Sequence, residues 1–240
     1  MKLTKPKILI TGSSRGIGAA TAIKSKLEGY DVILHGRSKT KHLINISRKL
    51  ESEYIYFDLR KENEIANAFK EISKLDALVN SAGINISKSF LDLTESDWKS
   101  IYAHNVFGIS NVIKYALPKL KKNNISRIVN IASVKGIYSA VGRVAYASSK
   151  AALINLTTGL AKELSPNILI NCVSPGFTNT DMTNNNLSNR IQKQIDSILL
   201  GRVADPSEIA EVILFLCSKK CTYITGQNII VDGGFSIKNV

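Results

Sequence analysis

The sequence predicts an α/β protein with a single doubly wound domain, in which a seven-stranded parallel sheet carries helices on both faces. Three observations lead to this fold class. Short apolar runs alternate along the chain with longer segments of helical periodicity, as they do in βαβ units. The first apolar run passes through a glycine-rich turn into a helix. No repeat, linker or low-complexity segment divides the 240 residues, so we expect one domain over 1–240.

The expected strands are apolar or β-branched runs, which is typical of strands that are buried on both faces of a parallel sheet. One expected helix carries Asn105 near its middle, where asparagine is a poor helix former. The segment 177–189 is rich in Asn and Thr without periodicity, which predicts a lid or binding loop. The expected strands are 7–11, 31–35, 54–57, 76–79, 128–131, 168–173 and 228–231, and the expected helices are 19–28, 62–73, 96–121, 145–164 and 206–216, the last with Asp205 as N-cap.

Composition is that of an ordinary globular protein, with 44% apolar and 21% charged residues. No apolar run reaches the roughly 18 residues that span a bilayer, and the N-terminus has no signal-peptide pattern, so we expect a cytoplasmic protein. The three cysteines and three histidines have neither disulfide nor metal-ligand spacing, so we expect no metal site. Cys217 and Cys221 are interpreted as packing residues.

The net charge of +13 is unusual and admits an acidic partner, a membrane surface or nucleic acid. No long basic block interleaves with aromatic residues, as it would in a protein that binds single-stranded nucleic acid. Compositional drift in a chain rich in Lys, Asn and Ile is the simplest interpretation, and an acidic partner is the second.

The glycine-rich turn after the first strand predicts a dinucleotide site. Gly12, Gly16 and Gly18 have the spacing G-x-x-x-G-x-G between a strand and a helix, which lets the backbone approach a pyrophosphate at the helix N-terminus. The second strand ends at Arg37, not at the acidic residue that binds the ribose 2′-hydroxyl of NAD, and Arg15 adds a second cation. This pattern predicts NADPH/NADP as the cofactor, although a plain glycine turn followed by a solvated basic turn would have the same residues.

The stretch 128–150 brings three chemical groups together. Its strand ends just before Ser133, at the carboxyl end of the sheet, where open α/β sheets bind ligands. Tyr146 and Lys150 follow four residues apart on one helix face. An ammonium near a phenol favours the phenolate, so we expect Lys150 to lower the pKa of Tyr146. Taken alone, the spacing also fits a half-buried tyrosine and a surface lysine on an amphipathic helix.

Together the motifs resemble those of the classical short-chain dehydrogenase/reductase family over essentially the whole chain. The resemblance implies a Rossmann fold, an NADP-dependent oxidoreductase that acts on CH–OH groups, and a likeness to the family's catalytic tetrad. The motifs that carry it are Thr11-Gly12-x-x-x-Gly16-x-Gly18, Asn80-x-Ala82-Gly83, Asn105, Ser133, Tyr146-x-x-x-Lys150 and Pro175-Gly176.

The resemblance also implies a role for each member of the tetrad. Tyr146 would protonate the carbonyl oxygen as hydride arrives from the nicotinamide, and Ser133 would hydrogen-bond the same oxygen. Lys150 would lower the pKa of Tyr146 and hold the nicotinamide ribose, and Asn105 would hold a water of a proton relay. The implied cofactor contacts are Gly12, Ser14, Arg15, Gly16, Ile17, Gly18, Arg37, Asp58, Leu59, Asn80, Ala82, Gly83, Tyr146, Lys150, Pro175, Gly176, Phe177 and Thr180.

Within the family, the C-terminal third is most similar to the 3-oxoacyl-[acyl-carrier-protein] reductases. That resemblance implies a homotetramer in fatty acid biosynthesis, with a 3-oxoacyl thioester as substrate and a basic surface that receives an acidic acyl-carrier protein. Arg127 falls where these enzymes have one carrier-contacting arginine, but the position of the second, just before the sixth strand, has none. The matching motifs are Pro175-Gly176-Phe177-x-x-Thr180-Asp181-Met182, Gly201-Arg202, Glu208-Ile209-Ala210 and Tyr223-Ile224-Thr225-Gly226.

The motifs do not identify a single substrate. Acetoacetyl-CoA, a sugar or a secondary metabolite are alternatives to a carrier-bound acyl group. A non-catalytic NADP-binding regulator is less favoured, because the tetrad is intact. The apolar residues that flank the tetrad suit an acyl chain, so we expect them to line the substrate pocket; they are Ile137, Tyr138, Val141, Phe177 and Met182.

Overall fold

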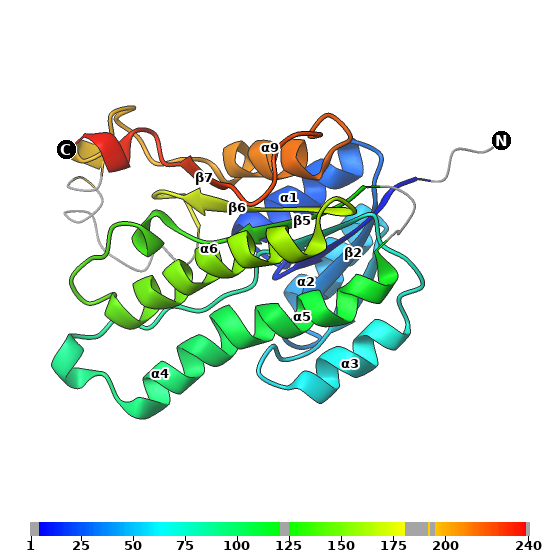
Figure 1. Cartoon of the computed structure of the whole chain (residues 1–240), viewed down its shortest axis with the longest axis horizontal. Coiled ribbons are helices and arrows are strands. Elements are labelled where there is room, and N and C mark those ends of the chain that lie inside the picture. The colour runs from blue at the N-terminus through cyan, green and yellow to red at the C-terminus, as the bar shows by residue number, and fades with distance from the viewer. Residues whose placement is uncertain (1–4, 121–124, 181–191, 193–194, 239–240) are drawn as a thin grey trace.

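Seven parallel strands form one sheet in the order β3-β2-β1-β4-β5-β6-β7 (Figure 1). The computed structural model describes residues 5–120, 125–180, 192 and 195–238. The predicted fold class is confirmed, and all seven predicted strands lie within two residues of their expected bounds. They are β1 (Lys7–Thr11), β2 (Asp31–Gly36), β3 (Glu53–Tyr56), β4 (Ala77–Asn80), β5 (Ser126–Ile131), β6 (Ile168–Pro175) and β7 (Asn228–Val231).

Helices cover both faces of the sheet and bury two separate apolar clusters. Alternate residues of a strand point to opposite faces, so Ile8 and Ile10 of β1 pack in one cluster and Leu9 in the other. The first cluster lies under α1, α2 and α9, and the second under α3, α5 and α6. The helices are α1 (Gly16–Leu27), α2 (Lys41–Leu50), α3 (Glu62–Lys70), α4 (Glu95–Tyr102), α5 (Ile109–Ala116), α6 (Val144–Leu164) and α9 (Pro206–Cys217).

Helix α2 is absent from the sequence-based prediction. Its N-cap residue, Thr40, accepts the N–H of Leu43, and Leu43 and Leu50 are its buried apolar residues. These two residues are seven positions apart, which is two helical turns, so they lie on one face. The segment is otherwise polar and basic, and two buried leucines are too weak a pattern to separate a short helix from a loop.

The long helix predicted over 96–121 is interrupted where it passes the carboxyl edge of the sheet. A π-helical segment, Ala103–Gly108, separates α4 from α5, and Asn105 lies inside it. Such segments contain an extra residue per turn and are frequent at functional sites. The poor helix-forming tendency of Asn105 therefore marks a real irregularity.

Other sequence-based expectations are confirmed in detail. Asp205 caps α9, since its carboxylate accepts the N–H of Ser207 while Glu208 accepts the N–H of Asp205. Cys217 and Cys221 are buried in the first apolar cluster. The predicted loop at 177–189 lies outside the described residues from 181 onward. No helix in the described part of the chain is long and apolar enough to cross a membrane.

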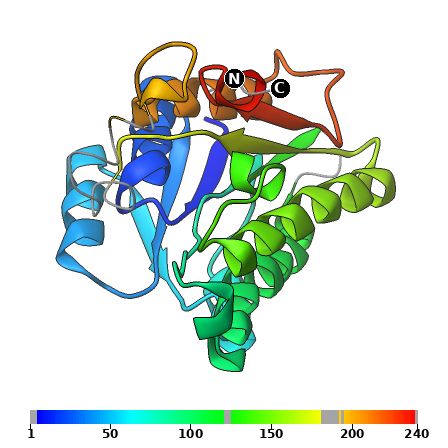
Figure 2. The same cartoon turned by 90° about the vertical axis from the view of Figure 1, so that its left-hand side faces the viewer.

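The carboxyl ends of all seven strands meet at one edge of the sheet, because the strands are parallel. Figure 2 looks onto the side of the molecule toward which the arrowheads of β6 and β7 point in Figure 1. Ligands of open α/β sheets bind at this edge.

Candidate active site

Ser133, Tyr146 and Lys150 come together where β5 ends and α6 crosses it. Ser133 lies two residues beyond Ile131, the last residue of β5, and hydrogen-bonds with the Tyr146 side chain. One turn further along α6, the Lys150 ammonium donates to the Ile131 carbonyl over 2.7 Å. Its Nζ lies 5.8 Å from the centre of the Tyr146 ring. The structure thus places three of the predicted tetrad residues around one point.

The electrostatics of this group differ from the sequence-based expectation. Burial raises the pKa of Tyr146, and the Ser133 hydrogen bond and the Arg143 charge only partly oppose that effect. Burial also lowers the pKa of Lys150 to about 8. The prediction of a lowered pKa for Tyr146 is therefore wrong for this structure, because desolvation outweighs the groups that lower it. A phenol with a raised pKa keeps its proton at neutral pH and so can donate it.

Asn105 ties the π segment to the loop that follows β4. Its amide Nδ2 donates to the Ile84 carbonyl (2.9 Å) and to Ser149 Oγ (3.0 Å), and its Oδ1 accepts the Ile84 N–H (2.9 Å). A Cβ on Gly83 would lie 3.2 Å from Asn105 Oδ1 and 3.4 Å from Lys150 Nζ. The loop, the π segment and α6 therefore meet at Gly83. Both N–H groups of the amide are therefore engaged, whereas its oxygen accepts one of the two hydrogen bonds that it can take.

The glycine-rich turn has the geometry that an anion at a helix N-terminus requires. Gly18 is packed so tightly that a Cβ there would lie 2.4 Å from the Gly12 carbonyl oxygen. Arg15 precedes the first residue of α1 and makes no side-chain capping hydrogen bond. The first N–H groups of α1 therefore have no side-chain cap, and a phosphate can accept from such groups. This arrangement fits the pyrophosphate of a dinucleotide.

The segment after β6 approaches the same turn. A cavity of about 420 Å³ is lined by Gly16 and Ala19 on one side and by Asn179 and Thr180 on the other. Two regions of predicted cofactor contacts, far apart in sequence, are thus brought together. Arg37, at the end of β2, is exposed to solvent.

The predicted contacts Asp58 and Leu59 are both buried after β3. Asp58 Oδ1 accepts the Arg60 main-chain N–H (3.0 Å), and the Arg60 guanidinium binds both of its carboxylate oxygens. This pairing holds the pKa of Asp58 at about 2. The carboxylate is therefore charged at neutral pH and already engaged by an arginine.

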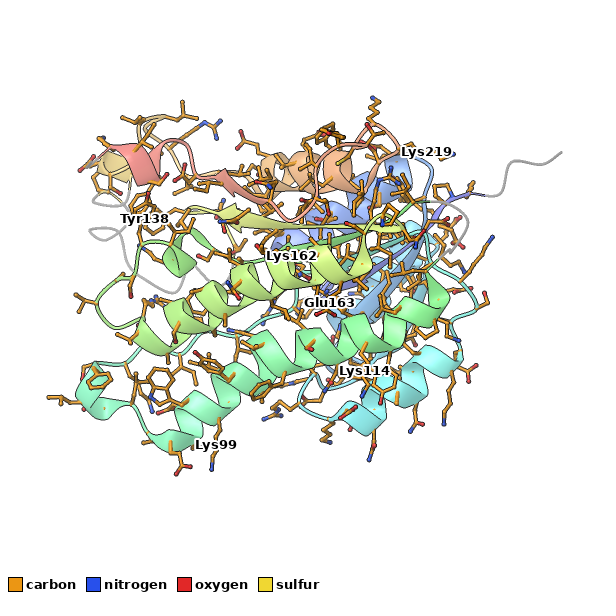
Figure 3. The ribbon with its side chains drawn as sticks, in the orientation of Figure 1. Lys99, Lys114, Tyr138, Lys162, Glu163 and Lys219 are labelled. Carbon is orange, nitrogen blue, oxygen red and sulfur yellow. The ribbon has the colours of Figure 1, made fainter. Side chains whose placement is uncertain are left out.

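The apolar side chains expected to line the substrate pocket lie on the segments that follow β5 and β6. Ile137, Tyr138 and Val141 are exposed on the loop between β5 and α6, and Phe177 is half-buried after β6. Tyr138 is labelled in Figure 3 at the end of the molecule where β6 and β7 finish. Met182 lies outside the described residues.

Arg127 is not a surface residue, and the expectation that it contacts a carrier protein is corrected. It is 7% exposed, and its guanidinium donates to the carbonyls of Ile125 (2.9 Å) and Cys221 (3.0 Å). It also lies near the start of β5, whereas the tetrad lies beyond the end of that strand. An arginine that joins two loops inside the protein offers no charge to a docking partner.

Comparisons with known proteins agree with this geometry. A family model described as enoyl-(acyl carrier protein) reductase matches residues 12–236. The 3-oxoacyl-[acyl-carrier-protein] reductase FabG of Aquifex aeolicus is 43% identical over 246 residues, which cover 98% of each chain. That of Thermotoga maritima is 36% identical and covers 99% of this chain and 100% of its own.

The chain belongs to the short-chain dehydrogenase/reductase family. A solved short-chain dehydrogenase/reductase from Brucella melitensis, described as a glucose/ribitol dehydrogenase, superposes with a TM-score of 0.89 at 33% identity and covers 98% of this chain and 99% of its own. The protein is therefore an oxidoreductase-family enzyme, and its family implies a nicotinamide cofactor.

His35 is a residue of this short-chain dehydrogenase/reductase that the sequence analysis does not single out. It is 1% exposed at the end of β2. Its Nδ1 accepts the Gly12 N–H (3.2 Å), its Nε2 lies 3.1 Å from the Phe57 carbonyl oxygen, and its own carbonyl accepts the Ser13 N–H (3.0 Å). Burial lowers its pKa to about 4, so the ring stays neutral with its proton on Nε2. The only signal in the sequence is a histidine that ends an otherwise apolar strand.

Two substitutions separate the bonds that His35 makes. The Oδ1 of Asn in His35→Asn replaces Nδ1 as the acceptor for Gly12, whereas the longer Gln in His35→Gln reaches Phe57 and leaves Gly12 unpaired. A buried unpaired N–H costs about 1–3 kcal/mol, so we expect His35→Gln to raise the Kd for NADPH about tenfold and His35→Asn to raise it less than about threefold. Fluorescence titration of NADPH measures both values. Equal changes in Kd, in step with equal losses of Tm, would mean that His35 only fills the core.

Proposed function

We propose that this enzyme reduces a ketone to a secondary alcohol with NADPH, and that the ketone is a 3-oxoacyl thioester. The observation that carries the proposal is the hydrogen bond between Tyr146 and Ser133 beside the buried ammonium of Lys150. A phenol that holds its proton and a hydroxyl directed at the same point are two donors for one carbonyl oxygen.

The proposed roles of these residues follow from the negative charge that develops on the carbonyl oxygen during reduction. When bound, the nicotinamide cofactor would supply the hydride for the carbonyl carbon. Tyr146 transfers its proton to the carbonyl oxygen, and Ser133 hydrogen-bonds that oxygen as it becomes negative. Ser133 Oγ accepts the Lys135 N–H over 3.1 Å, and its own proton can still be donated. Donors fixed before the reaction stabilise the transition state more than the substrate. The positive charge of Lys150 then stabilises the tyrosinate.

The proposed preference for NADPH over NADH is based on positive charges near the end of β2 and in the glycine-rich turn. Arg37 is exposed there, and Arg15 is exposed in the glycine-rich turn. Guanidinium groups bind a phosphate through charge-assisted hydrogen bonds, and neither residue is the acidic group that NAD-selective sites use.

The 3-oxoacyl thioester is supported by relatives named as 3-oxoacyl-[acyl-carrier-protein] reductases at 36–43% identity. The net charge of +13 would speed the encounter with an acidic carrier protein. Because Arg127 is buried, any carrier must be bound by other basic residues. Exposed apolar side chains at Ile137, Tyr138 and Val141 suit an acyl chain.

Cofactor choice is tested by the kcat/KM for NADPH and NADH in wild type and Arg37→Ala. Because an arginine–phosphate hydrogen bond contributes about 1.5–3 kcal/mol, we expect wild type to prefer NADPH and Arg37→Ala to lose more than about tenfold of that preference. Lys162→Ala, which removes a distant surface charge, serves as the control. Equal use of both cofactors by wild type, or unchanged selectivity in Arg37→Ala, would contradict the assignment.

The substrate class is tested with acetoacetyl-CoA, the same acyl group on an acyl-carrier protein, and a sugar ketone, each at low and high salt. We expect both thioesters to be reduced, with a preference for the carrier that shrinks as salt screens the surface charge. Tyr146→Phe measures the background, and its kcat should fall by far more than tenfold, the equivalent of about 1.4 kcal/mol. If both thioesters are inert while the sugar is reduced, the enzyme is a ketone reductase of another substrate class.

A further inference from the structure

Two cationic side chains, Lys135 and Arg143, flank the proposed proton donor and have no role in the mechanism above. Lys135 lies two residues beyond Ser133 and donates its main-chain N–H to Ser133 Oγ. Arg143 immediately precedes α6 and lies three positions before Tyr146. Both side chains are half-buried. We call them the cation pair.

The ammonium of Lys135 is held against aromatic rings. Its Nζ lies 4.8 Å from the ring centre of Phe235 and 5.4 Å from that of Phe177, and the two rings meet edge to face at 5.2 Å. Such contacts stabilise a cation through the negative face of each ring but leave its full charge uncompensated. Phe177 lies two residues beyond the end of β6.

The members of the cation pair repel each other. Burial lowers the pKa of Lys135, and the positive charge of Arg143 lowers it further. The same Arg143 charge acts on Tyr146, where it lowers the pKa. Arg143 is thus close enough to influence both the lysine and the proton donor. An anion placed between the two cations would relieve their repulsion.

No carboxylate forms an ion pair with either cation over residues 5–120, 125–180 and 195–238. Other arginines in these ranges do have one, since Arg60 binds Asp58 and Arg202 binds Glu208. Two half-buried, mutually repelling cations therefore lie on the segment that joins Ser133 to Tyr146, without a carboxylate partner in these ranges.

We propose that Lys135 and Arg143 form an anion-binding subsite beside Tyr146, which takes a carboxylate or phosphate carried by the ketone substrate. The proposal rests on the proposed ketone reduction and names a chemical feature of its substrate. The phosphates of the cofactor would bind elsewhere, at the glycine-rich turn between β1 and α1. In the sheet, β1 lies two strands away from β5. The anion at the cation pair therefore belongs to the substrate.

The apolar residues near the cation pair strengthen its attraction for an anion and indicate what kind of ligand it binds. Ile137, Tyr138 and Val141 lie on the same β5–α6 loop as the cation pair and are exposed. The rings of Phe177 and Phe235 cover the ammonium of Lys135, and such apolar cover lowers the local dielectric constant, so this charge attracts an anion more strongly than it would in open solvent. The ligand is therefore amphiphilic, with a short apolar part and one anionic group. Two sources meet this description: a carboxylate near the ketone of a small acid, or a phosphate on the arm of an acyl thioester.

Two matched pairs of ketones test the subsite and separate the sources. Acetoacetate and ethyl acetoacetate differ in a carboxylate, and acetoacetyl-4′-phosphopantetheine and acetoacetyl-pantetheine differ in a phosphate. We expect wild type to prefer the charged member of at least one pair. Lys135→Met, which keeps a long side chain against the rings, and Arg143→Gln should each reduce that preference about tenfold or more, mainly through KM. The pair whose preference falls identifies the source of the anion.

Lys162→Met is the matched control, because Lys162 is exposed near the far end of α6, away from Tyr138 (Figure 3). It removes the same charge and should leave both ratios unchanged. If Lys135→Met lowers the charged and uncharged members equally, the lysine serves only packing, and the subsite is wrong. Inert thioesters together with a cation-dependent preference for acetoacetate would refute the thioester substrate and support the subsite.

Binding without turnover provides an independent readout. Calorimetric titration of NADP-loaded Tyr146→Phe with acetoacetate and acetoacetyl-CoA measures affinity with the proton donor removed. We expect Kd to rise about tenfold for the recognised anion when Lys135→Met is added, with no such rise when Lys162→Met is added. Binding of neither anion, or binding that does not depend on Lys135 and Arg143, overturns the proposal.

Discussion

The buried ammonium of Lys150 is the interaction on which the rest of the site depends. Lys150 is 5% exposed and donates to the Ile131 carbonyl at the end of β5, so a charge is held inside the protein by a main-chain dipole. Burial of a cation is unfavourable unless it is hydrogen-bonded, and the pKa of Lys150 falls to about 8 as a result. The bond fixes α6 across the end of β5, and that crossing sets Tyr146, one turn earlier, against Ser133.

Two further side chains connect the chain segments around this point. Asn105 binds the main chain of Ile84 on both its N–H and its carbonyl, so the loop after β4 is held against the π segment. His35 joins the glycine-rich turn to the ends of β2 and β3. Neither residue is on β5 or α6. The proton-transfer groups and the dinucleotide turn are thus positioned by separate hydrogen-bonded residues, each buried at the carboxyl edge of the sheet.

Much of this arrangement is predictable from the sequence, because it follows from local patterns. Apolar runs identify every strand, and the spacing of Tyr146 and Lys150 places them on one face of α6. The sequence does not show which polar side chains are buried. The direction of the Tyr146 pKa shift depends on desolvation, and the interior position of Arg127 depends on loops that are distant in sequence. The π segment and helix α2 also escape prediction, since a backbone irregularity and a mostly polar helix leave only weak patterns.

The pH dependence of kcat/KM for ketone reduction tests the central claim, that a buried cationic Lys150 supports proton donation by Tyr146. Reduction needs Lys150 charged and Tyr146 protonated. The pKa of Lys150 is lowered to about 8 and that of Tyr146 is raised, so the lysine loses its proton first as pH rises. We predict that kcat/KM falls above pH of about 8 in wild type, and that Lys150→Arg, which stays charged, moves this fall upward by more than about one pH unit. A rate that is constant to pH of about 9.5, or an identical fall in both proteins, would contradict the account.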